Sequence, residues 1–193
     1  PLAQAADLRG INEIMLETIA DPQFARDLMD WVTEMEIEFA QAQIAAGANL
    51  IGIGDAAASL VSPAYYAEEV APREKKIVDA IHEAGARVRL HICGSIQGKY
   101  ETIAGLGVDL LDIDYLQSVA EVRAGMGPDQ CLSGNLDPVR NIMNSEPDQI
   151  KADFARAHEE AGENFILAAG CEVPPETPEE NVVAMFEYAR STT

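Results

Sequence analysis

The feature that most constrains the fold of this chain is a regular alternation of short apolar runs with amphipathic segments. Five apolar runs have the length and composition of β-strands, and they span residues 48–55, 86–94, 108–115, 130–137 and 164–172. Segments with the helical spacing of apolar residues separate these runs, and few residues join one element to the next. Such alternation is typical of a parallel α/β sheet built from repeated β-α-β units.

Local capping signals predict where several helices begin. A residue that can cap a helix is followed directly by proline at Asp21-Pro22, Ser62-Pro63, Asp137-Pro138 and Thr177-Pro178. Proline suits the first helical position because its missing N–H group has no partner there anyway. We therefore expect helices to start at these four points, with a kink or break near Pro72 in the helix that follows Ser62.

Two architectures agree with this alternation, an open doubly wound sheet and a TIM-type barrel. A dinucleotide-binding doubly wound fold carries G-x-G-x-x-G between a strand and the following helix. This chain has no such motif in that context, and its "GLGVDL" precedes a strand instead. The absence of the motif favours the barrel.

Composition excludes several classes of partner. The formal net charge is −20, from 33 acidic and 13 basic residues, so no basic cluster is available to bind a nucleic-acid backbone. No apolar run approaches the length of about 18 residues that a membrane span requires. The first residues lack the pattern of a secretory signal, and three cysteines suit no disulfide framework, so we expect a cytoplasmic protein with reduced thiols.

Polar side chains collect where the predicted strands end. They are Asp55, His91 with Cys93, Asp112 with Asp114, Asn135 with Asp137, and Cys171 with Glu172. Active sites of parallel α/β proteins are built at the carboxyl ends of the strands. We therefore expect a functional site at this edge, with Asp55, Asn135 and Asp137 as candidate substrate-binding residues. Asp137 also has a structural interpretation, since an acid before proline is what a helix start requires.

His91 and Cys93 are one residue apart on a strand, so their side chains point to the same face. Cys171 ends the last strand and can reach the same edge of the sheet. An imidazole and two thiolates are ligands that suit Zn²⁺, and Asp114 is a candidate for a fourth ligand. The alternatives are a core histidine with two buried thiols, and an Asp114 that only binds loop amides.

The ordered motifs "HICG", "SGNLDP" and "AAGCEVPPETPEEN" resemble the uroporphyrinogen decarboxylase superfamily, and "GDAAASLVSPAYYAEEVAPREKKIVDAIHEAG" fits the same pattern. The resemblance runs through essentially all of residues 1–193. It implies a (β/α)8 TIM barrel of which this chain is the C-terminal part of one domain, with about five of the eight βα units. The missing N-terminal part, or another chain, would then cover the open sheet edges.

The resemblance implies two chemistries. Corrinoid-dependent methyltransferases of this superfamily bind Zn²⁺ through H-x-C and a distant cysteine, the pattern that His91, Cys93 and Cys171 match. Asp114 lies where comparable zinc enzymes often carry a carboxylate. True decarboxylases act on uroporphyrinogen III without a metal and typically have His-Gly where this chain has Gly170-Cys171.

We therefore expect a zinc-dependent methyltransferase that moves a methyl group from a methylcobamide, carried by a partner corrinoid protein, to a small thiol such as coenzyme M or to a related acceptor. The first alternative is a uroporphyrinogen decarboxylase of haem biosynthesis. The second is a non-catalytic fragment or interaction module, because five strands cannot close an eight-stranded barrel.

Overall fold

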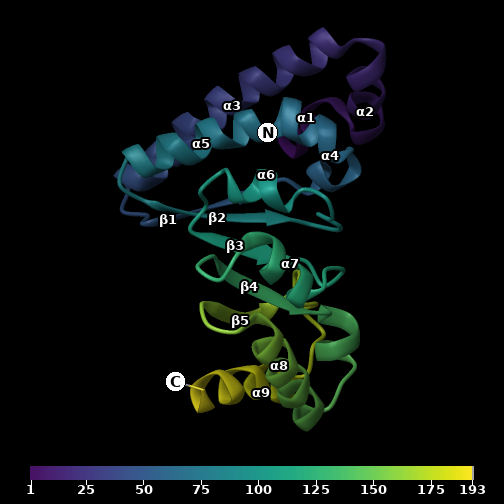
Figure 1. Cartoon of the computed structure of the whole chain (residues 1–193), viewed down its shortest axis with the longest axis vertical. Helices are drawn as coiled ribbons and strands as arrows, with labels where there is room; N and C mark the ends of the chain where they lie inside the picture. The colour runs from purple at the N-terminus through teal and green to yellow at the C-terminus, as the bar shows by residue number, and fades with distance from the viewer. Residues whose placement is uncertain (193) are drawn as a thin grey trace. The chain divides into compact units, whose positions relative to one another are not determined.

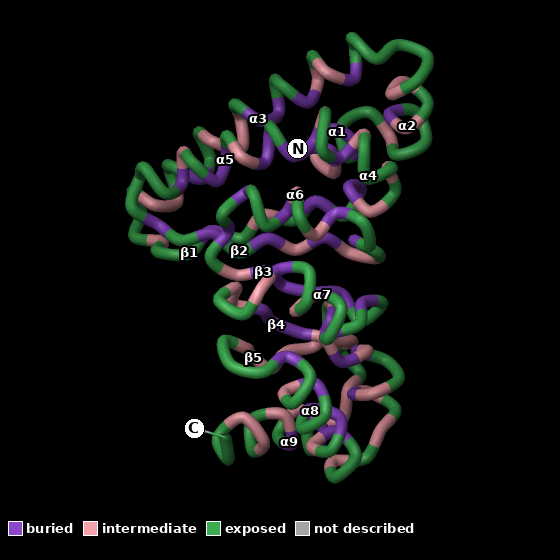
Figure 2. The backbone as a smooth tube through the Cα atoms, viewed as in Figure 1, coloured by how far each residue is buried: buried purple, intermediate pink, exposed green. Residues whose placement is uncertain are grey.

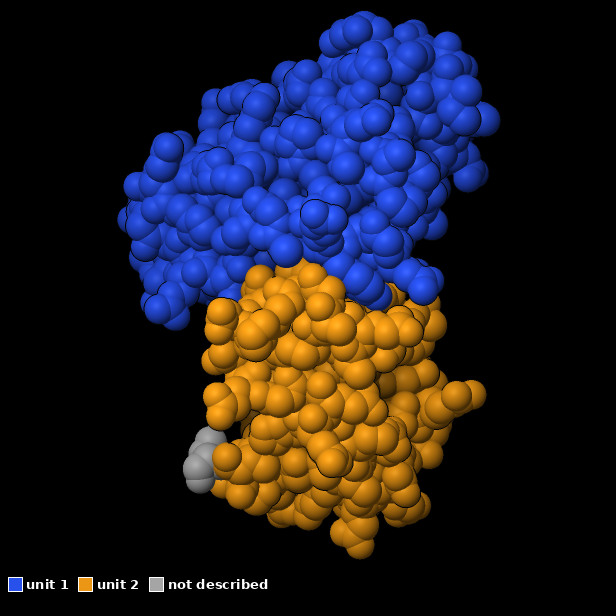
Figure 3. Space-filling view, viewed as in Figure 1, with its two compact units in different colours: residues 1–109 blue, residues 110–193 orange. Residues whose placement is uncertain are grey.

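The computed structural model describes residues 1–192, and it divides them into two compact units, residues 1–109 and residues 110–192 (Figure 3). Each unit contains parallel strands that alternate with helices (Figure 1). The five predicted strands are confirmed. The prediction of one domain over residues 1–193 stays a prediction, and Thr193 lies outside the described residues.

The unit of residues 1–109 holds two parallel strands, β1 (Leu50–Gly54) and β2 (Arg87–Ile92), in a register that pairs Ile53 with Leu90. Its helices are α1 (Leu2–Arg9), α2 (Ile11–Ala20), α3 (Pro22–Ala45), α4 (Pro63–Tyr65), α5 (Ala71–Glu83) and α6 (Tyr100–Ala104), and its helical turns are η1 (Ala56–Leu60) and η2 (Tyr66–Val70). Figure 1 shows α3 and α5 side by side next to β1 and β2, in agreement with their contacts.

The unit of residues 110–192 holds three parallel strands in the order β3 (Leu110–Ile113), β4 (Cys131–Leu136) and β5 (Phe165–Ala169). The register pairs Asp112 with Ser133 and Asn135 with Ala168. Its helices are α7 (Val119–Met126), α8 (Pro147–Ala161) and α9 (Glu179–Ser191), and its helical turn is η3 (Pro138–Met143). The helix α8 packs on β4, β5, α7 and α9.

Strand periodicity determines which side chains enter the core. In β2, Val88, Leu90 and Ile92 are buried, while Arg87 and Arg89 are exposed. Figure 2 shows buried and less buried positions following one another along this strand. The buried set packs with α5, whose Ile77, Val78 and Ile81 follow one another at helical spacing on a single face. His91 and Cys93 therefore belong to the strand face that points away from this helical layer.

The predicted helix starts are confirmed at three of four positions. Asp21 accepts a hydrogen bond from the N–H of Phe24, Ser62 accepts one from Tyr65, and Asp137 accepts one from each of two N–H groups. The prediction that Thr177 caps the last helix is wrong: Pro178 occupies the cap position, and it makes no side-chain hydrogen bond to the helix. The Thr177 hydroxyl is buried and has no hydrogen-bond partner among residues 1–192.

The predicted break near Pro72 lies slightly earlier in the chain. A π-helical turn, η2, spans Tyr66–Val70 and joins α4 to α5, and Pro72 then lies in the first turn of α5. Within residues 1–192, no helix is both long enough and apolar enough to cross a membrane.

Candidate metal centre

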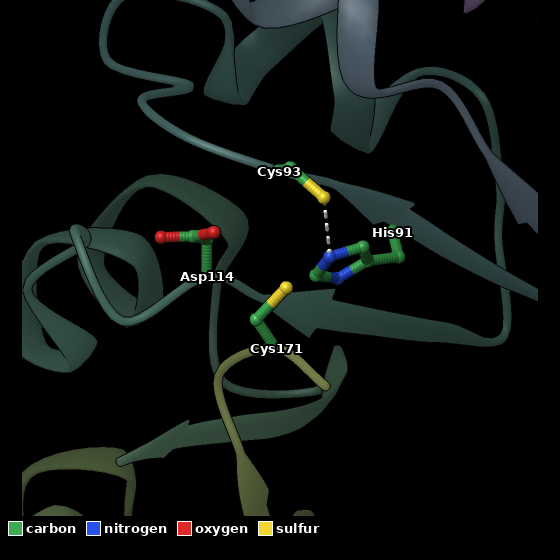
Figure 4. A group of neighbouring side chains, drawn as sticks. All are labelled: His91, Cys93, Asp114 and Cys171. Atoms are coloured by element: carbon green, nitrogen blue, oxygen red, sulfur yellow. Dashed lines mark hydrogen bonds between the residues drawn. The ribbon is translucent and has the colours of Figure 1, made fainter. Parts of the chain in front are cut away.

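The first pair of candidate ligands lies at the carboxyl end of β2. His91 is the penultimate residue of the strand and Cys93 follows its end, so strand periodicity turns both side chains to the same side. The Nε2 atom of His91 lies 3.1 Å from the Sγ atom of Cys93 (Figure 4). Both residues are half-buried. The predicted juxtaposition of this imidazole and this thiol is therefore present.

The second pair belongs to the unit of residues 110–192. Asp114 follows β3 and is only 3% exposed, and Cys171 follows β5 and is half-buried (Figure 4). A carboxylate oxygen of Asp114 lies within 4.8 Å of the Sγ atom of Cys171. The Oδ1 atom of Asp114 also accepts a hydrogen bond of 2.8 Å from the N–H of Leu116. This carboxylate thus stabilises its own loop, as the alternative interpretation predicted, and lies beside a thiol.

Gly170 explains how Cys171 can lie so close to the chain that follows Asp114. A Cβ atom built on Gly170 would lie 2.4 Å from the backbone nitrogen of Tyr115, which is closer than any real contact of this kind. The N–H of Gly170 donates to the carbonyl of Leu136 at the end of β4. Only glycine allows the end of β5 to approach Tyr115 in this way, and the approach places Cys171 next to Asp114.

The four donors fit zinc by their chemistry. Each residue offers one ligand atom: an imidazole nitrogen, two thiol sulfurs and a carboxylate oxygen. These are the ligand types of catalytic and structural zinc sites, and thiolates disfavour the hard cations Mg²⁺ and Ca²⁺. None of the three cysteines forms a disulfide bond within residues 1–192, so neither candidate thiol is consumed in a disulfide.

Asp55 has a structural role that the sequence did not predict. It is completely buried at the end of β1, and its two carboxylate oxygens accept hydrogen bonds from the first N–H groups of α1, those of Leu2 at 3.0 Å and Ala3 at 2.6 Å. A carboxylate there satisfies orphan donors and interacts favourably with the positive end of the helix. Its N–H also donates to the carbonyl of His91. Substrate binding by Asp55 stays a prediction.

Asn135 and Asp137 line a hollow of about 350 Å³ in the second unit, together with Gln117 and Arg140. The Nδ2 group of Asn135 donates to the carbonyls of Asp114 and Gln117, at 3.3 and 2.8 Å. Asp137 accepts from the N–H groups of Val139 and Arg140, both at 2.9 Å, and so begins η3. The helix-start interpretation of Asp137 is confirmed, while substrate binding by either residue stays a prediction.

Glu74 and Asp153 are buried acidic residues that were not predicted from the sequence, and Glu74 is completely buried. Burial in the first place, and the nearby charge of Asp55 in the second, raise the pKa of Glu74 to about 8. Helical spacing could have found it, because Glu74 precedes Ile77, Val78 and Ile81 by three, four and seven positions and thus shares their buried face.

Comparison with known proteins gives a family and a fold. The sequence profile described as "Uroporphyrinogen decarboxylase (URO-D)" matches residues 1–192. The methylcobamide:CoM methyltransferase MtbA of Methanosarcina mazei is 31% identical over 166 residues, which are 85% of this chain and 48% of that protein. A uroporphyrinogen decarboxylase of Geobacter metallireducens is 31% identical over 170 residues, which are 87% of this chain and 49% of that protein. The chain therefore spans about half the length of these relatives.

Solved structures confirm the predicted fold class. A methyltransferase from Methanosarcina mazei matches with a TM-score of 0.88 and 28% identity, over 97% of this chain and 55% of that one. A putative vitamin-B12 independent methionine synthase from Listeria monocytogenes matches with a TM-score of 0.62 and 20% identity, over 91% of this chain and 57% of that one. The second likeness concerns the fold alone. The five parallel strands and their helices correspond to part of a (β/α)8 barrel.

Proposed function

Because this chain belongs to the uroporphyrinogen decarboxylase family, we propose that it is part of an enzyme of that family's methyltransferase branch, and that this enzyme uses zinc to transfer a methyl group from a corrinoid protein to a thiol. The observation that carries the proposal is the pair of His91 and Cys93, whose ligand atoms lie 3.1 Å apart. A decarboxylase that works without a metal has no need of an imidazole and a thiol in this arrangement. The similarity to the methylcobamide:CoM methyltransferase supports the same assignment.

In this proposal His91, Cys93 and Cys171 are the zinc ligands, and Asp114 is a candidate fourth ligand. With His91, Cys93 and Cys171 alone bound, one coordination position is left for a substrate, which is the arrangement of catalytic zinc sites. With Asp114 bound as well, the substrate would have to displace this carboxylate. Asn135, Asp137 and Asp55 remain the candidates for contacts with the polar end of the methyl acceptor. The Oδ1 atom of Asp114 already accepts from Leu116, so this hydrogen bond would orient the carboxylate as an outer-shell partner orients a ligand.

In the proposed reaction the thiol releases its proton to solvent, and a lone pair of the resulting thiolate forms the bond between sulfur and the methyl carbon. The bond between cobalt and that carbon breaks, and its electron pair stays on the cobalt of the partner corrinoid. When bound, zinc would supply the low pKa that keeps an acceptor thiol deprotonated near neutral pH. The chain's own contribution is to hold the three ligands at the strand ends and to shield them partly from water, since His91, Cys93 and Cys171 are all half-buried. We further propose a cytoplasmic location and a separate corrinoid protein as the methyl donor.

The second candidate function is uroporphyrinogen decarboxylation. It is favoured by relatives of that name that are as similar as the methyltransferase, such as the decarboxylase of Geobacter metallireducens at 31% identity. This function predicts no bound metal and turnover of uroporphyrinogen by the full-length protein.

Zinc content distinguishes the two candidates. We expect about one zinc ion per chain in the full-length protein by elemental analysis. Cys93→Ser should lose this zinc while the protein keeps its circular dichroism spectrum. Cys131→Ser is the matched control, because Cys131 lies at the opposite, amino end of a strand and its thiol is not among the candidate ligands.

Full-length protein that binds no zinc after incubation with the ion under reducing conditions would contradict the proposed function. Turnover of uroporphyrinogen by such a protein would establish the second candidate. Zinc that is lost equally in Cys93→Ser and Cys131→Ser would place the metal elsewhere.

A further inference from the structure

The side chain of Asn135 binds the backbone on either side of the candidate zinc ligand Asp114. Continuing the register of β3 and β4, which pairs Asp112 with Ser133, by two residues brings Asn135 opposite Asp114. The Nδ2 atom of Asn135 lies 3.3 Å from the carbonyl oxygen of Asp114 and 2.8 Å from that of Gln117. A carbonyl oxygen can only accept a hydrogen bond, so the amino group of the amide, and not its oxygen, must face both carbonyls.

Residues 114–117 form a tight turn that two further hydrogen bonds close. The N–H of Gln117 donates to the carbonyl of Asp114 at 3.1 Å, which is the hydrogen bond of a β-turn. The N–H of Leu116 donates to the Oδ1 atom of Asp114 at 2.8 Å, so the same turn also holds the carboxylate. The two carbonyls that Asn135 binds are those of the first and last residues of the turn. One amide group on the adjacent strand therefore holds both ends of the turn.

Gly134 allows the backbone of Asn135 to come close enough for these contacts. Its φ angle of +130° is one that side-chain-bearing residues rarely adopt. A Cβ atom on Gly134 would lie 2.7 Å from the carbonyl oxygen of Ile113, the residue before Asp114. Glycine thus lets the end of β4 approach the chain directly ahead of the turn, and Asn135 is the next residue.

The orientation of the Asp114 carboxylate depends on this turn. Asp114 is only 3% exposed, so water has little access to replace the N–H of Leu116 as the partner of Oδ1. If the turn opened, this N–H group would move away from Oδ1 and the carboxylate could rotate. Groups that hold a metal ligand in one orientation strengthen metal binding, although they do not touch the metal.

We propose that Asn135 is a positioning residue of the metal centre: by holding both ends of the turn 114–117, it fixes the Asp114 carboxylate, the candidate fourth ligand, before zinc binds. The inference rests on the proposed function, and within it Asn135 acts through Asp114. The amino group of Asn135 is then committed to the turn, and only its Oδ1 atom is left for a contact with a methyl acceptor. Zinc binding requires less ordering of the chain when this carboxylate is already held.

The test compares the zinc affinity of full-length wild type and Asn135→Ala, measured by competition with a chromophoric chelator. We expect Asn135→Ala to lower the affinity about 10- to 100-fold, as loss of an outer-shell partner does. In an Asp114→Ala background the same change should cost no further affinity, because no carboxylate is left to hold. The absorption spectrum of bound Co²⁺ should also change in Asn135→Ala, toward the spectrum of Asp114→Ala.

Asn181→Ala is the matched control, because Asn181 makes the same kind of backbone contact and is not among the candidate ligands. Its Nδ2 atom donates to the carbonyls of Ile142 and Ser145, at 2.7 and 2.8 Å, and the residue is 2% exposed. Asn181→Ala should lower the thermal midpoint but keep the zinc affinity and the Co²⁺ spectrum of wild type. A purely structural role of Asn135 would give this same result for Asn135→Ala.

Zinc bound equally tightly by wild type and Asn135→Ala would overturn this inference and leave the proposed function intact. An equal loss of affinity with and without the Asp114 carboxylate would overturn it too, because Asn135 would then act by another route. A wild type that binds no zinc would contradict the proposed function itself, and the inference would fall with it. Should Asn135→Ala not fold, Asn135→Ser takes its place in the same comparison, since one hydroxyl proton can bind only one of the two carbonyls.

Discussion

At the scale of single residues, Gly170 limits what the candidate metal centre can tolerate. The residue leaves no room for a Cβ atom, because the backbone nitrogen of Tyr115 would lie 2.4 Å away. The obstacle is backbone and not the flexible end of a side chain, so it cannot rotate aside. Any larger residue must push the end of β5 away from Tyr115, and Cys171 must move with it.

We expect Gly170→Ala to lower the free energy of unfolding by about 1 to 3 kcal/mol, as forced contacts in packed regions do. The measurement is urea denaturation followed by circular dichroism. Gly52→Ala is the matched control, since Gly52 also lies in or beside a strand but a Cβ there meets nothing within 4 Å. Equal stability of the two variants would show that the backbone at Tyr115 can move away from a Cβ atom at little cost in free energy.

Residue positions that depend on strand periodicity could be predicted from the sequence. His91 and Cys93 are two positions apart at a strand end, so their common direction follows from the pleat alone. The role of Asp55 could not be predicted, because it depends on a partner from a distant segment. Asp55 binds α1 from 53 positions away, and nothing in the local pattern indicates that partner.

At the scale of elements, Arg123 joins the ends of two helices. Its guanidinium donates to the carbonyl of Gly127, just after α7, and to that of Ala161, at the end of α8, at 3.0 and 2.6 Å. It also donates to Gln130, which precedes β4, and to Glu163, which precedes β5. Helix ends leave carbonyl groups without intrahelical donors, and one side chain here satisfies several of them.

Arg123→Lys is expected to destabilise the protein by about 2 to 3 kcal/mol, because an ammonium cannot reach acceptors on both sides as a planar guanidinium does. Thermal and urea unfolding measure the effect. Arg156→Lys serves as the control, since the Arg156 side chain is 63% exposed and its ion pair with Asp153 lies within its own helix. A loss no greater than that of the control would mean that water replaces the guanidinium at these carbonyls.

Element boundaries were predictable where the signal was local. The starts of α3, α4 and η3 follow directly from a capping side chain next to a proline. The π-helical turns η2 and η3 were not predictable, because the sequence pattern of an α-helix and that of a π-turn are the same over five or six residues. Thr177 is a typical capping residue directly before a proline, yet its hydroxyl is buried and does not accept from the helix N–H groups.

At the scale of the whole molecule, the excess of negative charge opposes compaction. The chain carries 33 acidic and 13 basic residues, and the net charge of −20 is brought closer together when the chain folds. Like charges on a folded surface repel over a distance that depends on salt. The Debye length shortens from about 30 Å to about 8 Å between about 0.01 M and about 0.15 M ionic strength.

We therefore expect the thermal midpoint to rise as sodium chloride increases over this range, and potassium chloride at equal ionic strength should give the same rise. The comparison of the two salts separates screening from specific ion binding. A midpoint that is constant or falls with added salt would mean that attractive ion pairs, such as that of Arg26 with Glu69, outweigh the repulsion.

The fold class could be predicted at this scale because five strands and their helices alternate along the chain, and the match to a barrel structure confirms it. The division of residues 1–192 into two compact units could not, since no linker or change in composition marks residue 109.

The capping of α1 by Asp55 has a consequence for the order of events during synthesis. Leu2 precedes its hydrogen-bond acceptor by 53 positions. At translation rates of about 5 to 20 residues per second, Leu2 is added to the chain on the order of 3 to 10 s before Asp55. During that time α1 lacks the carboxylate that satisfies its first two N–H groups. The hydrogen bonds of these first N–H groups of α1 can therefore form only after β1 and Asp55 have been synthesised.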